Sequence, residues 1–75
     1  DEDMLAFDIE KAWPEFVGEE FVKYTQGMTI KNKHLYVTML SPAASNELMM
    51  RRSEILNKIH KKFEIDSTVL AAIHF

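Results

Sequence analysis

The sequence predicts an α+β domain with two layers, in which a three-stranded sheet packs on one long helix. Three observations indicate this fold class. Apolar residues recur with helical spacing over residues 41–64, they alternate with polar residues over residues 28–40, and a β-branched apolar segment ends the chain. A length of 75 residues fits a single domain, residues 1–75. Because the chain has no cysteine, the fold must depend on packing and not on disulfides.

The chain is predicted to open with an amphipathic helix. Its apolar residues with helical spacing are Met4, Leu5, Ile9, Ala12, Trp13 and Phe16. Pro14 disfavours helix at the residue before it, which predicts a break near Trp13 and a second helix over residues 14–24. Gly18 lies inside that second segment and is expected to end one turn and begin another. Trp13 and Phe16 are interpreted as core residues.

A β-hairpin is predicted next, with strands over residues 28–31 and 34–40. The apolar residues that alternate with polar or amphipathic ones are Met28, Ile30, Leu35, Val37 and Met39. The intervening turn contains Asn32, a residue that tolerates backbone angles that most residues avoid.

The longest predicted element is one continuous helix over residues 41–64. Ser41 is a good N-cap, and Pro42 suits the first helical position, where its missing N–H costs nothing. One face of this helix carries the apolar residues Ala44, Leu48, Ile55, Leu56, Ile59 and Phe63. So wide an apolar face needs a partner surface, and the sheet is expected to supply it.

A third strand is predicted over residues 69–75, where the chain is apolar and β-branched. The helix between the second and third strands permits a crossover connection, which allows these two strands to be parallel. The predicted order of elements is therefore α-α-β-β-α-β.

The charge is distributed unevenly along the chain. The net charge is −3, which does not favour nucleic-acid binding. Residues 1–20 hold eight acids and one base, a net charge of −7, whereas residues 21–75 hold eight bases and four acids, a net charge of +4. This asymmetry indicates either a partner surface or a solvated acidic helix beside a mildly basic body.

The sequence contains no pattern typical of an enzyme or of a cofactor or metal site. The histidines, His34, His60 and His74, have no metal-ligand spacing and are expected at the surface or its rim. There is no nucleophile elbow, and two glycines cannot form a phosphate-binding loop. We expect no active site, no cofactor and no metal. No apolar run is long enough to span a membrane and no secretory leader is recognisable, so a cytoplasmic location is expected.

The candidate nucleic-acid contacts are five cations. Three of them form a ridge along the long helix and two belong to the hairpin tip: Arg51, Lys58, Lys62, Lys31 and Lys33. An alternative interpretation is a solvated helix surface, because Glu47 precedes Arg51 by four residues and Glu54 precedes Lys58 by four. That order favours helix-surface ion pairs of about 0.2–0.5 kcal/mol each.

Two further residues of the long helix are candidate protein contacts. Met49 and Met50 are adjacent, so they diverge on a helix, and Met50 is expected to be the exposed one. Arg52 projects into the apolar face, where its stem can pass a sheet edge or its head can reach a partner.

The order and spacing of several short motifs resemble the DciA family over residues 12–75. The motifs are Trp13-Pro14-Glu15-Phe16-Val17-Gly18, Tyr24-Thr25, Leu35-Tyr36-Val37, Ser41 with Glu47-Leu48, Ile55-Leu56-Asn57, and Ile73-His74-Phe75. The resemblance implies a KH-like fold and a role in bacterial DNA replication. It implies a protein without catalysis or cofactor that loads or recruits the hexameric replicative helicase and binds single-stranded DNA.

The chain departs from the family pattern at three positions. Ala44 stands where a Trp is common, Gly27 where a Pro is common, and Lys33 where the hairpin turn usually has Gly. The Gly-x-x-Gly clamp of KH domains is also absent. The resemblance therefore implies the fold and the role, and it transfers no helicase-contact residue.

Two functions remain open from the sequence. The first is an adaptor that binds the replicative helicase and single-stranded DNA. The second is a protein-only module that dimerises through an open sheet edge or the apolar part of the first helix, which a net charge of −3 favours.

Overall fold

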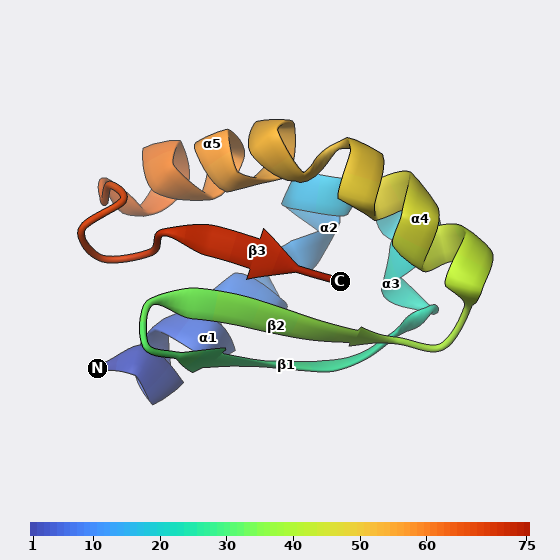
Figure 1. The fold of residues 1–75 in the computed structure, drawn as a ribbon, viewed down its shortest axis with the longest axis horizontal. Coiled ribbons are helices and arrows are strands. Elements are labelled where there is room, and N and C mark those ends of the chain that lie inside the picture. The colour runs from blue at the N-terminus through green and yellow to red at the C-terminus, as the bar shows by residue number, and fades with distance from the viewer.

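The structure, a computed structural model, describes all residues from 1 to 75 and has five helices and three strands (Figure 1). In chain order the elements are α1 (Glu2–Lys11), α2 (Trp13–Val17), α3 (Glu19–Val22), β1 (Thr25–Lys31), β2 (His34–Met39), α4 (Pro42–Met50), α5 (Arg52–Phe63) and β3 (Ala72–His74). The fold is α+β with a three-stranded mixed sheet, as predicted. None of its helices has the length and apolar character that a membrane span requires.

The helical segment at the start of the chain is divided into three. Asp1 caps α1 by accepting a 2.8 Å hydrogen bond from the Met4 N–H. The predicted break near Trp13 is confirmed, because Ala12 leaves the helical region and Pro14 lies in the first turn of α2. Gly18 separates α2 from α3 with φ of 91°, and a Cβ there would collide with the Glu20 side chain. The predicted role of this glycine is therefore confirmed.

The hairpin is confirmed, with a first strand three residues longer than predicted. β1 and β2 are antiparallel, and a bulge at Gln26 shifts the register between Thr25↔Met39 and Gly27↔Thr38. Asn32 and Lys33 form the turn with φ of 52° and 69°. Positive φ at both central residues is the pattern of the type I′ turn, whose twist matches that of the flanking strands.

The prediction of one continuous helix over residues 41–64 is wrong at Arg51. This residue has φ of −107° and ψ of 14°, and it separates α4 from α5. The Arg52 guanidinium donates a 3.0 Å hydrogen bond to the Met49 carbonyl in the last turn of α4. Because of this break, α4 and α5 pack on different strands, α4 on β2 and α5 on β3 (Figure 1).

The sheet has the order β1-β2-β3, and β3 pairs in parallel with β2, as the crossover connection allows. The third strand is shorter than predicted, because the chain forms a turn over residues 67–69 and extends only at Ala72–His74. Asp66 stabilises this turn by accepting hydrogen bonds from the N–H and the hydroxyl of Thr68.

The two faces of the sheet differ in what covers them. The inner face packs on the helices through Ile30, Leu35, Val37 and Ile73, all buried. Trp13 and Phe16 are 2% and 3% exposed and pack in the same core, as predicted. The outer face has no buried residue, and its outward positions on the three strands are Gly27, Thr29, Lys31, His34, Tyr36, Thr38, Ala72 and His74.

Candidate functional site

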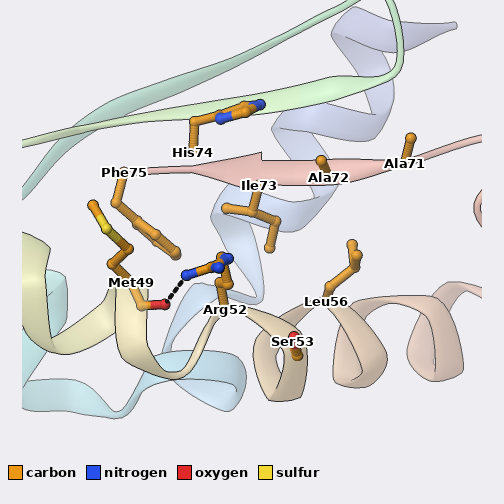
Figure 2. Close-up of a pocket in the computed structure, with 9 residues that line it drawn as sticks. All are labelled: Met49, Arg52, Ser53, Leu56, Ala71, Ala72, Ile73, His74 and Phe75. Atoms are coloured by element: carbon orange, nitrogen blue, oxygen red, sulfur yellow. Dashed lines mark hydrogen bonds between the residues drawn. The ribbon is translucent and has the colours of Figure 1, made fainter.

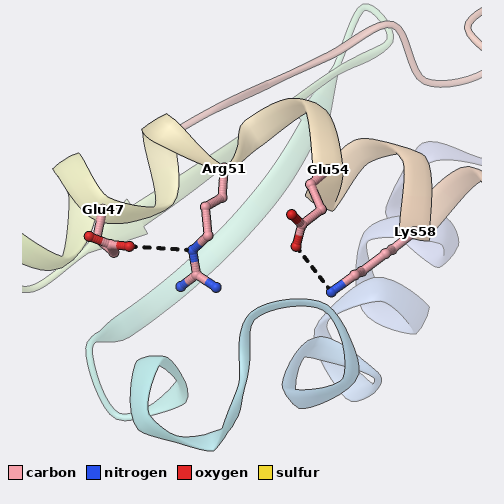
Figure 3. A network of polar contacts seen from close by, with 4 residues as sticks. All are labelled: Glu47, Arg51, Glu54 and Lys58. Atoms are coloured by element: carbon pink, nitrogen blue, oxygen red, sulfur yellow. Dashed lines mark ion pairs between the residues drawn. The ribbon is translucent and has the colours of Figure 1, made fainter.

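Each of the three ridge cations predicted to contact phosphates has a carboxylate partner. Arg51 Nε lies 3.6 Å from Glu47, and Lys58 Nζ lies 3.4 Å from Glu54, as the spacing of four residues indicates (Figure 3). Lys62 Nζ lies 2.9 Å from Glu15 of α2, a partner that the sequence did not indicate. Exposed pairs of this kind contribute about 0–1 kcal/mol to stability, but they reduce the positive potential of the ridge.

Arg51 is further held by an aromatic ring. Its guanidinium carbon lies 4.9 Å from the centroid of the Phe21 ring, which is cation–π geometry. Its Nε is buried without a hydrogen bond, since the Glu47 oxygen at 3.6 Å is too distant for one. Arg51 therefore serves the junction between α4 and α3 in this structure.

The two hairpin-tip candidates, Lys31 and Lys33, are exposed and have no carboxylate within ion-pair distance of their side chains. The backbone beneath them is fixed, because the Lys33 N–H donates to Glu2 Oε2 at 2.8 Å and the Lys33 carbonyl accepts from the Ala71 N–H at 2.7 Å. The five candidate cations thus occupy two surfaces, the ridge and the hairpin tip, and only the tip presents unpaired charge.

A groove of about 490 Å³ lies between β3 and the break that separates α4 from α5 (Figure 2). Six of its nine lining residues are hydrophobic, and the nine are Met49, Arg52, Ser53, Leu56, Ala71, Ala72, Ile73, His74 and Phe75. Arg52, a predicted protein contact, lines this groove with its guanidinium tied to the Met49 carbonyl. Met50, the other predicted contact, is 80% exposed, which confirms that it is the more exposed of the two adjacent methionines.

The structure brings together two histidines that lie 40 residues apart in the sequence. His34 Nδ1 and His74 Nε2 lie 2.8 Å apart on the outer face of the sheet, beside Tyr36. Two features of the sequence could have indicated this contact. Strand alternation places His34 and Tyr36 on one face of the sheet, and a third strand parallel to theirs can place His74 beside them. His60 lies elsewhere, with Nε2 2.8 Å from the Leu70 carbonyl. No cluster of three or more His, Cys, Asp or Glu residues that could hold a metal ion is present.

Trp13 and Thr25, two residues of the motif pattern, are in direct contact. Trp13 Nε1 donates to Thr25 Oγ1 at 3.0 Å, and that hydroxyl donates to the Phe21 carbonyl at 2.9 Å. The hydroxyl therefore joins α2, the end of α3 and the start of β1. The family model described as "Dna[CI] antecedent, DciA" matches residues 5–74.

The chain belongs to the DciA family. This family is one of replication-related helicase loaders and associates with the replicative helicase, and its members are adaptors without enzymatic activity. The match covers nearly the whole chain and includes all five candidate cations and the groove residues except Phe75. Comparisons with curated proteins and with solved structures gave no significant match.

Proposed function

We propose that this chain is a KH-like adaptor without catalytic activity that binds the replicative DNA helicase and single-stranded DNA. The observation that carries the proposal is the DciA match over residues 5–74. The helix-covered mixed sheet, with a parallel pair formed across a helical crossover, supports the KH-like description.

Charge supports the DNA part of the proposal, with the hairpin tip as its strongest element. Residues 21–75 carry a net charge of +4 from eight bases and four acids, although the whole chain is at −3. Lys31 and Lys33 are exposed and unpaired, whereas Lys58 and Lys62 would have to leave a carboxylate to reach a phosphate. We infer that the tip leads the contact with the phosphate backbone and that the ridge cations, Arg51 included, add to it.

The protein-binding part is supported by exposed apolar side chains beside charged ones. Met50 is 80% exposed at the end of α4 and Arg52 lines the groove, and both residues are candidate contacts with the helicase. The acidic α1 also exposes Met4 and Phe7, which are 65% and 61% exposed. Exposed residues of this kind are typical of protein–protein contacts when they lie within a polar rim.

A pull-down with the whole chain tests the proposal. The tagged protein is incubated with the replicative helicase, with and without single-stranded DNA, and retention of the helicase is measured. Helicase retention in both conditions supports the adaptor role. A helicase that stays in the flow-through in both conditions contradicts it. The variant Met50→Asp is expected to weaken retention, and Lys61→Asp, an exposed position on α5, is the matched control.

A second candidate function is a protein-only module that dimerises. It is favoured by the net charge of −3 and by the exposed Met4 and Phe7 on the first helix. Sedimentation equilibrium of the isolated chain separates the two functions. A stable dimer that does not bind single-stranded DNA supports this second function, and a monomer that binds DNA contradicts it.

A further inference from the structure

The outer face of the sheet is free of helices and carries an aromatic cluster. Side chains alternate along a strand, so the inward set packs on the helices and the outward set meets solvent. Tyr36 is 43% exposed, His74 is exposed and His34 is half-buried. Three ring side chains on an otherwise polar face need an explanation, because they cover one another only in part and Tyr36 and His74 remain exposed.

The three rings have nearly parallel planes. The ring centroids of Tyr36 and His74 lie 4.8 Å apart with 16° between the planes, and those of His34 and Tyr36 lie 6.3 Å apart with 21°. His34 and His74 differ by only 6°, with centroids 5.0 Å apart. These separations fall in the range of favourable aromatic pairs.

The two histidines form a single flat unit. The two nitrogens lie 2.8 Å apart, whereas the ring centroids lie 5.0 Å apart. The difference is about the sum of the two ring radii, so both nitrogens lie close to the line that joins the centroids. The imidazoles therefore meet edge to edge in nearly one plane, with one ring donating and the other accepting. The hydrogen bond fixes both ring orientations, so little side-chain entropy remains to be lost when a planar ligand stacks.

The neighbours of the rings leave room for such a ligand and supply a positive charge. Thr29 lies opposite Tyr36, and Gly27 lies opposite Thr38, with open space where a Cβ would be. Lys31 lies opposite His34 at one end of the cluster, has no carboxylate partner, and precedes the exposed Lys33 in the turn.

Flat rings beside unpaired lysines match the chemistry of single-stranded nucleic acid. Unpaired bases stack on aromatic side chains, while their phosphates pair with nearby cations. A duplex keeps its bases stacked on one another and inaccessible, and an apolar peptide would need a larger apolar area than a face with three rings among threonines. The cluster and the hairpin tip thus provide both recognition elements on one continuous surface.

We propose that the outer sheet face is a base-stacking site, at which bases of single-stranded DNA stack on Tyr36, His74 and His34 while Lys31 and Lys33 contact the adjoining phosphates. This inference rests on the proposed DNA binding and adds to it the site and the mode of contact. It moves the centre of the DNA surface from the helical ridge to the opposite side of the sheet.

Fluorescence anisotropy with labelled oligothymidylate and the whole chain tests the proposal. Tyr36→Ala is expected to weaken binding about 5- to 150-fold, since one stacked base contributes about 1–3 kcal/mol. Tyr36→Phe keeps the ring and is expected to bind like the wild type. Tyr24→Ala is the matched control, because Tyr24 is 39% exposed and lies outside the cluster. Thermal unfolding of each variant verifies that the fold is retained.

An abasic oligonucleotide of equal length and charge provides the second measurement. The wild type is expected to bind it more weakly than oligothymidylate, and Tyr36→Ala is expected to bind both alike, with the salt dependence of the wild type. If the wild type binds oligothymidylate and Tyr36→Ala retains full affinity, the stacking site is wrong and the proposed DNA binding stands. If the wild type binds neither oligonucleotide at low salt, the proposed DNA binding itself is wrong.

Discussion

His34 and His74 are 40 residues apart in the sequence, yet their imidazoles share a 2.8 Å hydrogen bond across the parallel strands β2 and β3. This contact reinforces the shortest pairing in the sheet, because β3 has only three residues. It also gives β3, the last strand of the chain, a side-chain attachment to the hairpin in addition to the backbone ladder.

We expect His74→Ala and His34→Ala each to lower the free energy of unfolding by about 0.5–1.5 kcal/mol, the usual net contribution of a hydrogen bond. Because the two residues act through one bond, the double variant should lose little more than either single variant. Urea unfolding at neutral pH measures all three. If the loss in the double variant equals the sum of the losses in the two single variants, the hydrogen bond contributes no coupling energy between the two residues.

Thr25→Val tests the hydroxyl that joins Trp13 to the Phe21 carbonyl. Valine has nearly the same shape but leaves the Trp13 Nε1–H without its acceptor in a side chain that is 2% exposed. The expected loss of stability is about 1–3 kcal/mol. Thr29→Val, on the exposed outer face, is the control and should change stability by less than about 0.5 kcal/mol. Equal effects of the two substitutions would contradict this role of Thr25.

Lys33→Gly should stabilise the protein by about 0.5–1 kcal/mol. Lys33 has φ of 69°, a left-handed conformation that costs a residue with a Cβ energy and costs glycine almost none. Both backbone hydrogen bonds of Lys33 are retained in the variant. The midpoint of thermal unfolding measures the gain. Lys31→Gly, at a strand position, should be destabilising, and a gain there would show that charge and not backbone conformation is responsible.

Replacing the hairpin-tip lysines should affect DNA binding more than replacing ridge lysines. Lys31→Ala with Lys33→Ala is expected to reduce the slope of log affinity against log salt by about 0.7 for each phosphate that these lysines neutralise in the wild type. The double variant Lys58→Ala with Lys62→Ala removes the same amount of charge. Because Glu54 and Glu15 already pair with these lysines, this variant is expected to change the slope less. Anisotropy titrations at several salt concentrations make the comparison. A larger effect of the ridge pair would place the phosphate path along α5.

Asp66 should titrate below the ordinary range of an aspartate. The hydrogen bonds that its carboxylate accepts from the Thr68 side chain and backbone lower the pKa of Asp66. Because the folded-state pKa is depressed, the stabilisation is fully present above the unfolded-state pKa and is lost as pH falls through the folded-state value. An NMR titration of the carboxyl carbon measures the pKa directly. In Thr68→Val it should rise toward the ordinary value, and an unchanged titration would contradict this cause.

The sequence predicted most of the secondary structure because local signals are strong in this chain. Pro14 and Gly18 located the helix breaks, and Asn32 located the turn. The error at Arg51 arose because the apolar residues on its two sides share one helical face, so periodicity alone continues through the residue. The break depends on how α4 and α5 contact different strands, and no local pattern records that choice.

The sequence predicted only those features of the candidate site that depend on residues close together in the chain. Spacing by four residues identified the pairs Glu47–Arg51 and Glu54–Lys58, whereas the contact of Lys62 with Glu15 joins separate helices and has no local signal. The exposure of Met50 followed from its being adjacent to Met49 on a helix. The sequence by itself thus determined the α+β class, the hairpin and the helix-surface pairs, because these depend on residues within a few positions of one another.

Tertiary structure alone decided which residues meet across the sheet. The parallel register of β2 and β3 sets Tyr36 opposite His74 and brings the His34 ring against the His74 ring. A shift of one residue would turn His74 toward the helices and Ile73 toward solvent, since side chains alternate along a strand. Burial of Leu35 and Ile73 in the core fixes that register, and so hydrophobic packing on the inner face aligns the aromatic cluster on the outer one.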